Sequence, residues 1–251
     1  MKKLFLILVS MFLVVSRSEA QTVEQNCVHY PYNTQVGINL NVNMLSKMRI
    51  EPLSDYFQSY PSFGADFGVY LYQRVYKWFG IQISAEYSAL TVCDGATSNF
   101  SDNTSIEMSY YAFGAFTFPI LFNASYYFNE KHGLDISFGG APLILFVGEA
   151  GWGVGMGNLG KNYWHYRLDY DTPFNFSLYG KLGYNFLLKN KNTLRVAIVG
   201  SYASKPYAQG RYYVLINETE EESGFTSLRN TFVGLQFSYG FTMKRLLCNP
   251  K

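Results

Sequence analysis

The stretch SYYAFGAFTFPILFNASYYFNEKHG, residues 109–133, alternates two kinds of side chain over an unusual length. From residue 110 to residue 128 every even position is apolar, aromatic or small, while the odd positions become polar at Asn123, Ser125 and Asn129. Side chains two residues apart lie on the same face of a β-strand. The stretch therefore predicts a long strand with one greasy face and one polar face, as in a soluble sheet or in a strand between lipid and water.

The rest of the chain repeats this alternation and shows no helical period. The composition is 48% hydrophobic and 18% aromatic but only 15% charged, and beyond the N-terminus there is no apolar run of about 18 residues that would indicate a membrane helix. The apolar residues are instead distributed over alternating segments. Seven such segments accompany the quoted one: 35–44, 62–75, 79–91, 134–148, 172–188, 193–202 and 231–243.

The connections between these segments are short and long in strict turn. Three are short, at 76–77, 129–133 and 189–192, and four are long, at about 45–61, 92–106, 149–170 and 203–229. Transmembrane β-barrels have short periplasmic turns, longer outer loops and an even number of strands. The sequence therefore predicts an all-β protein, an eight-stranded antiparallel up-and-down transmembrane β-barrel. The even face of residues 116–128 is predicted to meet lipid, and residues 108–115 to continue the strand above the membrane.

The N-terminus predicts export. Lys2 and Lys3 precede the apolar run 4–15, and Ser18-Glu19-Ala20 forms a small-residue cleavage site, which is typical of a secretory signal peptide. We therefore expect a cleaved signal at 1–20 and a barrel at 21–251 in the bacterial outer membrane. Removing the signal takes away three of 20 basic and one of 18 acidic residues, so the mature chain has no net charge and nothing favours nucleic acid.

Several stretches resemble a known group of proteins. FPILFNASYYF (118–128) before a short turn, ISFGGAPLIL (136–145) after it and the aromatic last strand FVGLQFSYGF (232–241) resemble small outer-membrane β-barrels of the OmpA-like and PorT-like type found in the Bacteroidota. The chain departs from them in the tail TMKRLLCNPK, which follows the last strand.

The resemblance implies a non-enzymatic role in envelope integrity, adhesion or ligand binding, with no cofactor. The implied partners are outer-membrane lipids and lipopolysaccharide, the barrel assembly machinery and an extracellular ligand. The alternative is a component of envelope transport or protein secretion, as in PorT-like proteins.

Two motifs in the long connections resemble ligand sites. Gly155, Gly157 and Gly160 form a G-x-G-x-x-G pattern, but a dinucleotide site requires a following helix, and KNYWHYRLDYD is none. NETEEE (217–222) carries four glutamates, which suit a divalent cation or a cation bridge to lipopolysaccharide. We interpret both stretches as solvated outer loops.

One histidine is placed for chemistry at the outer rim. His165 shares its loop with Asp169 and Asp171, and an acid, a histidine and a serine at the rim would suit a lipid-modifying enzyme. No serine is obviously placed with them, so a loop histidine is the preferred interpretation.

The polar face is predicted to hold charges of both signs inside the barrel. By alternation these are Asp66, Arg74, Glu86, Asp135, Lys181 and Arg195. Counted from the short turns, Arg74, Asp135 and Arg195 form a lower layer and the other three an upper one, with Lys181 between Asp66 and Glu86. An eight-stranded barrel is just wide enough for its own side chains, and charges shielded from water are usually paired. We therefore predict a plugged, ion-paired lumen; the alternative is a narrow pore.

The cysteines predict one disulfide. Cys27 precedes the first strand and Cys248 follows the last, so barrel closure brings both to the periplasmic rim of an oxidising compartment. A bond between them would enclose nearly the whole mature chain. Cys93 lies in a predicted outer loop and is expected to stay unpaired, and three free cysteines are the alternative.

Overall fold

The computed structural model describes residues 34–76, 78–97, 106–146, 152–159, 162–169, 174–216 and 219–243, all within one compact unit, Pro31–Lys251. The predicted signal peptide lies outside these residues. In the described ranges the secondary structure consists of fifteen β-strands. No helix among the described residues has the length and apolar character needed to cross a membrane.

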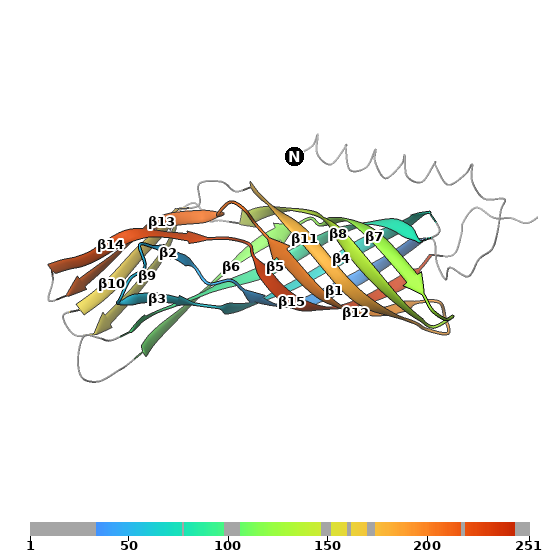
Figure 1. The fold of residues 1–251 in the computed structure, drawn as a ribbon, viewed down its shortest axis with the longest axis horizontal. Coiled ribbons are helices and arrows are strands. Elements are labelled where there is room, and N and C mark those ends of the chain that lie inside the picture. The colour runs from blue at the N-terminus through green and yellow to red at the C-terminus, as the bar shows by residue number, and fades with distance from the viewer. Residues whose placement is uncertain are drawn as a thin grey trace, which may run out of the picture. The chain divides into compact units, whose positions relative to one another are not determined.

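Eight antiparallel strands close into a barrel, which confirms the predicted fold class (Figure 1). Each barrel strand pairs with the next barrel strand along the chain, and β15 returns to pair with β1 from Gln35 to Leu45, all of β1 except its first residue. The strands are β1 (Thr34–Leu45), β4 (Ser62–Tyr76), β5 (Phe79–Thr97), β6 with β7 (Ile106–Thr117 and Ile120–Tyr127), β8 (His132–Phe146), β11 (Phe174–Leu187), β12 (Thr193–Tyr202) and β15 (Phe232–Thr242).

The long strand predicted within 109–133 consists of β6 and β7, with an interruption at Phe118–Pro119. Proline has no backbone N–H to donate to a neighbouring strand, so the ladder breaks there. The register is the same on both sides, because Thr117 pairs with Glu86 and Ile120 with Ile83. The alternation therefore continues through the break, and the even residues from Phe116 onward face outward as predicted.

The two described short turns are fixed by asparagine side chains. Asn129 Oδ1 accepts the backbone N–H groups of Lys131 and His132, both at 2.9 Å. In the turn after β11, Asn190 Oδ1 accepts the N–H of Asn192 at 3.1 Å, and Lys191 adopts a φ of 66°. Asparagine is favoured in turns because its amide bonds to backbone two residues further on.

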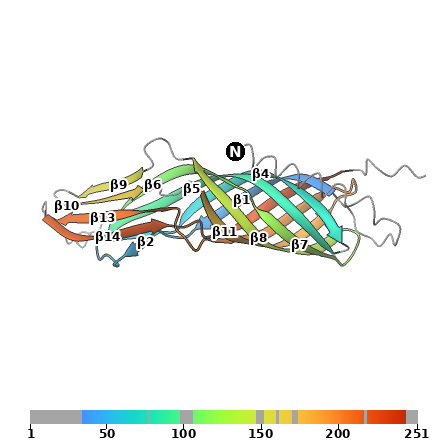
Figure 2. The same cartoon turned by 90° about the horizontal axis from the view of Figure 1, so that it is seen from above.

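The long connections are not loops, which corrects the prediction. They supply a second, five-stranded sheet in the order β2 (Arg49–Glu51), β14 (Thr219–Leu228), β13 (Ala208–Ile216), β10 (Asn162–Asp169) and β9 (Trp152–Leu159). β3 (Phe57–Tyr60) pairs with the far end of β5, which runs to Thr97, and residues 98–105 of the second long connection lie outside the described residues. We call these strands, with the ends of β5 and β6 beyond the barrel, the extension (Figure 2).

The extension is a folded element because it has an apolar interior. Met48, Phe57, Tyr212 and Val214 are each at most 2% exposed, and the rings of Phe57 and Tyr212 stack with centroids 5.5 Å apart. Burying side chains of this size is the main driving force for ordering a polypeptide segment.

The outside of the barrel is an apolar belt. On β1 the outward residues Val36, Ile38, Leu40, Val42 and Met44 are 40–53% exposed, and every other barrel strand exposes large apolar residues in the same way. Soluble proteins rarely expose apolar patches larger than a few hundred Å². Such a belt is therefore suited to contact with the hydrocarbon region of a membrane.

Aromatic rings mark the edge of the belt nearest the short turns. The ring of His132 packs against Phe186 at 5.1 Å, and its Nδ1 lies 2.6 Å from the hydroxyl of Tyr184 in a hydrogen bond. Phe128 stacks on the same histidine at 6.2 Å. Rings with one polar end are typical of the girdles at a membrane interface.

Candidate functional site in the barrel interior

All six charged residues predicted to face the lumen lie inside the barrel. None is more than 8% exposed, a fraction that belongs to Arg74, and Glu86 and Asp135 are at 1%. Neighbouring strands place them in two layers, with polar uncharged side chains between them. The structure thus provides a buried polar interior whose contacts decide what the barrel can do.

The lower layer contains an ion pair. Arg195 Nε lies 3.2 Å from Asp135 Oδ1, and the two side chains are 2% and 0% exposed. Arg195 also donates to Asn185 Oδ1 at 2.7 Å and to Gln82 Oε1 at 3.1 Å, while Asn123 Nδ2 donates to the other oxygen of Asp135 at 3.1 Å. The buried charges are therefore both paired and hydrogen-bonded, as stable burial of a charge requires.

The upper layer holds its two carboxylates with asparagine amides from β1. Asn41 Nδ2 donates to Asp66 Oδ2 at 3.0 Å and to Glu86 Oε2 at 3.3 Å. Asn39 donates to Glu86 at 3.1 Å and Asn43 to Asp66 at 2.6 Å. Alternate residues of one strand thus form a ladder of donors that faces both acids.

Lys181 reaches these carboxylates through a relay rather than by contact. Its Nζ donates to Gln236 Oε1 at 2.9 Å, and Gln236 Nε2 donates to Asn41 Oδ1 at 2.7 Å. The sequence predicted that Lys181 lies directly between Asp66 and Glu86. In the structure the side-chain amides of Gln236 and Asn41 separate the lysine from these carboxylates. The oxygen of a side-chain amide accepts a hydrogen bond and its nitrogen donates one. Gln236 and Asn41 therefore connect the ammonium group of Lys181 to the two carboxylates through a chain of hydrogen bonds.

Tyrosine rings fill the lumen nearer the short turns. Tyr70 and Tyr72, both on β4, are 3% and 0% exposed. Glycines on facing strands leave room for them. A Cβ at Gly37 would lie 2.3 Å from the ring of Tyr70, and one at Gly80 would lie 2.4 Å from the hydroxyl of Tyr72.

The other half of the lumen is apolar, which sequence reasoning missed. Above the carboxylates the inward side chains form one hydrophobic cluster with the extension, including Leu121, Leu143, Leu145, Val199 and Phe232. The signal was present in the sequence. The odd positions of 141–145 and 197–199 are as apolar as the even ones, a pattern typical of strands buried on both faces.

The residues considered for outer-rim chemistry lie in strands of the extension. His165 is opposite Tyr213 and Asp169 opposite Gln209 in the β10–β13 pairing, while Asp171 lies outside the described residues. Gly155 and Gly157 belong to β9, Gly160 lies outside the described residues, and the next described element is the strand β10, so no helix follows the glycine pattern there. This arrangement does not form the phosphate-binding turn that the motif needs.

The glutamate stretch also belongs to a strand, β14, from its third residue onward. Glu222 accepts hydrogen bonds from the Ser54 hydroxyl and from the backbone N–H of Asp55, the latter at 3.1 Å. It therefore ties β14 to the segment after β2. Burial, and then the charge of Glu222, raise the pKa of Tyr212, whose hydroxyl donates to the carbonyl oxygen of Pro52 at 3.1 Å. Among the described residues no three His, Cys, Asp or Glu are grouped to hold a metal.

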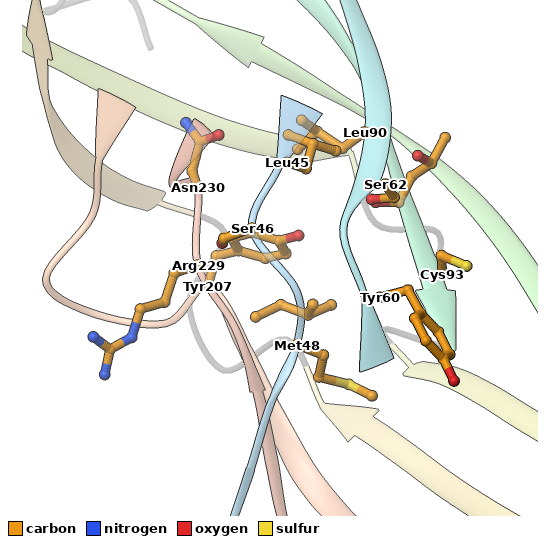
Figure 3. Close-up of a pocket in the computed structure, with 12 residues that line it drawn as sticks. Leu45, Ser46, Met48, Tyr60, Ser62, Leu90, Cys93, Tyr207, Arg229 and Asn230 are labelled. Carbon is orange, nitrogen blue, oxygen red and sulfur yellow. The ribbon is translucent and has the colours of Figure 1, made fainter. Parts of the chain in front are cut away.

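Cys93 lies in β5 rather than in a loop, where its thiol is free and 3% exposed. It lines a pocket of about 10 Å³, room for a single water, between Tyr60 on one side and Tyr207 and Asn230 on the other (Figure 3). The predicted disulfide partners, Cys27 and Cys248, lie outside the described residues.

Comparison with known proteins extends the observation of a closed barrel. No protein-family model and no curated protein matches the chain. Among solved structures it is similar to the outer membrane protein OprG from Pseudomonas aeruginosa, with a TM-score of 0.52 at 8% identity, covering 84% of this chain and 97% of that one. The chain has the fold of a small outer-membrane β-barrel.

Two further solved structures of outer-membrane proteins align over most of this barrel with lower scores. AlkL, solved in lipid bilayers, has a TM-score of 0.40 at 10% identity, covering 91% of this chain and 99% of that one. Ail, the attachment invasion locus protein of Yersinia pestis, has a TM-score of 0.30 at 8% identity, with 82% and 98% covered.

Proposed function

We propose that the chain is an integral outer-membrane barrel without enzymatic activity, closed by its own side chains, that carries a rigid binding platform on the cell surface. The observation that carries this proposal is the reversal of polarity across the barrel wall. On β1 the even residues from Val36 to Met44 are 40–53% exposed and apolar, while Asn39, Asn41 and Asn43 between them are at most 2% exposed. Lipid outside and a filled polar interior account for both faces.

The closed lumen is supported by three successive fillings along the barrel. Tyr70 and Tyr72 share the end near the short turns with the lower polar layer, the upper polar layer occupies the middle, and the apolar cluster occupies the rest. Gln35, Tyr72, Gln82 and Gln236 are each 0% exposed, which supports a lumen filled by protein side chains. A passage for ions would need an open, hydrated path past these side chains.

The extension suits a binding role because it is a packed sheet rather than a set of flexible loops. In the proposed orientation the short turns face the periplasm and the extension faces outward, since short periplasmic turns are the rule for such barrels. β5 belongs to both parts, pairing with β4 in the barrel and with β3 beyond it. A ligand bound to the extension would thus meet a surface already ordered, which reduces the entropic cost of binding.

Conductance across planar lipid bilayers tests the closed lumen. We expect the wild-type protein to give no steady single-channel current, because its interior is filled. The double variant Asp135→Ala/Arg195→Ala, which removes the buried ion pair, should conduct if it still folds, as checked by slower gel migration after boiling. A steady current from the wild-type protein would refute the plug.

The absence of enzymatic activity is tested separately. Lipid A extracted from a strain lacking the gene should have the same mass profile as lipid A from the parent strain. A lost or added acyl group would identify the protein as a lipid-modifying enzyme instead.

A further inference from the structure

A groove crosses the outside of the barrel wall near the end that carries the extension. It has a volume of about 570 Å³, and its lining passes from β8 through β11, β12 and β15 to β1. These strands are consecutive neighbours in the barrel, and the groove follows one row of paired residues across them, Phe138–Gly180–Gly200–Val233–Met44. Its rim consists of outward apolar side chains: Phe138, Leu178, Tyr202, Val233 and Met44.

Two glycines form the floor of the groove. Gly180 on β11 and Gly200 on β12 are direct partners in the strand pairing, and both lie on the outward face. A Cβ at Gly180 would lie 3.9 Å from the nearest atom, the backbone oxygen of Ser137, and one at Gly200 would lie 3.7 Å from the backbone oxygen of Phe232, so both positions have room for a side chain. By contrast, a Cβ at Gly140 would lie 2.3 Å from the ring of Phe176, which already covers that position. The groove is therefore unfilled where these two residues lack side chains.

The groove is continuous with the apolar belt. Its rim residues Phe138, Leu178 and Val233 are 60%, 48% and 58% exposed, like the rest of the lipid-facing surface. Its occupant therefore comes from the membrane, and an open groove with apolar walls matches a hydrocarbon chain. A symmetric contact between two copies would place groove against groove and leave both empty.

Basic residues follow directly beyond the groove. Lys47, Lys205 and Arg229 lie in the three segments that continue β1, β12 and β15 past the rim, and these segments, 46–48, 203–206 and 229–231, contain no acidic residue. Lys47 and Lys205 are exposed, and Arg229 Nε is buried with no hydrogen-bond partner. The Arg229 side chain points away from the small pocket that Cys93 lines (Figure 3).

We propose that this surface binds a phosphorylated glycolipid of the outer leaflet, the lipid A part of lipopolysaccharide. One acyl chain lies over Gly180 and Gly200, and a phosphate group meets Lys47, Lys205 and Arg229. Cations placed on the extension side of an apolar groove fit a lipid whose anionic headgroup lies directly above its chains. The assignment to the outer leaflet rests on the orientation given under the proposed function.

Native mass spectrometry of the full mature chain in detergent tests the site, with purified lipid A, its dephosphorylated form and phosphatidylethanolamine as probes. Gly180→Leu/Gly200→Leu fills the groove. The matched control is Ala85→Leu, which adds a leucine to an exposed, outward position of β5 on the opposite side of the barrel. Gel migration before and after boiling shows that each variant is folded.

The wild-type protein and Ala85→Leu should bind lipid A equally, at least tenfold more tightly than phosphatidylethanolamine. Filling the groove should weaken lipid A binding at least tenfold. Replacing Lys47, Lys205 and Arg229 by glutamine should weaken binding of lipid A but not of its dephosphorylated form.

Three results would overturn the proposal: equal binding by the groove-filled variant and the control, no preference for phosphorylated lipid, or a dimer that only the groove-filled variant loses. The first two leave the barrel and its closed lumen intact. Protease added to whole cells tests the orientation separately, because cleavage at the short turns would remove the outer-leaflet assignment itself.

Discussion

Replacing Arg195 by methionine tests whether the lumen is dry. The guanidinium group is 2% exposed and contacts Asp135 at 3.2 Å, Asn185 at 2.7 Å and Gln82 at 3.1 Å. Methionine has a similar length but no donor, so the variant leaves a carboxylate that is 0% exposed without its cation. Removing one partner of a buried ion pair costs about 3–5 kcal/mol. We expect the free energy of unfolding to fall by about that amount.

The chain supplies its own control for this experiment. Arg49 and Glu51 form an ion pair in the extension in which both side chains are 57% exposed. An exposed pair contributes at most about 1 kcal/mol, so Arg49→Met should change stability little. The double variant Asp135→Leu/Arg195→Met removes both buried charges and should be more stable than Arg195→Met alone, because apolar replacement of a whole pair is often nearly neutral.

Urea unfolding in lipid vesicles, followed by tryptophan fluorescence, measures these differences, and gel migration gives an independent probe. If Arg195→Met and Arg49→Met lose the same small amount of stability, Asp135 is hydrated in the folded barrel. That result would refute the dry lumen and, with it, the physical basis of the closed barrel.

Three further predictions follow from the same structure. Lys181→Met should cost about 1–3 kcal/mol in urea unfolding, less than loss of Arg195, because the lysine contacts an amide rather than a carboxylate; a larger loss than that of Arg195→Met would contradict the relay. Gly139→Val should prevent a folded, heat-modifiable barrel, since its Cβ would lie 2.0 Å from a backbone oxygen; normal migration would refute the close approach. Protease added to whole cells should cut only in the extension and spare the turns at 129–133 and 189–192, with cleavage of those turns in lysed cells as the control.

The barrel itself could be predicted from the sequence because the two faces of its wall have different surroundings, an apolar exterior and a largely polar interior. Alternation with period two assigns each residue to the inner or the outer face of the barrel. An assignment shifted by one residue would place a polar side chain such as Asn41 against lipid. The same rule survives Pro119, where a ladder bond is missing but the register is kept. Local pattern and global fold agree in the barrel except where both faces are apolar, as at 141–145 and 197–199.

The extension could not be predicted in the same way. In AQGRYYVLI (208–216) the buried residues Tyr212 and Val214 alternate with Tyr213 and Leu215, which are also apolar, so the period is hidden. In β9 alternate positions are glycines, which carry no hydropathy signal. These strands are defined by what packs on them, and that information lies far away along the chain.

For the lumen, the sequence predicted which residues face inward but not which of them touch. Alternation and height place Lys181 level with Asp66 and Glu86. The amides between them come from β1 and β15, and the two residues that bond, Asn41 and Gln236, are 195 positions apart. Their approach depends on how the sheet closes, which no local pattern encodes.

The Asn41–Gln236 hydrogen bond joins the first strand of the barrel to the last, and this makes it a check on closure. The two residues are direct partners where β1 meets β15. A shift of the β1–β15 register by one residue would point the Gln236 side chain toward lipid. A slip of two would bring Ser238 or Gly234 opposite Asn41 instead, and neither has an amide to receive Lys181. Only one offset between the strand ends completes the relay, so these polar side chains select the shear with which the cylinder is sealed.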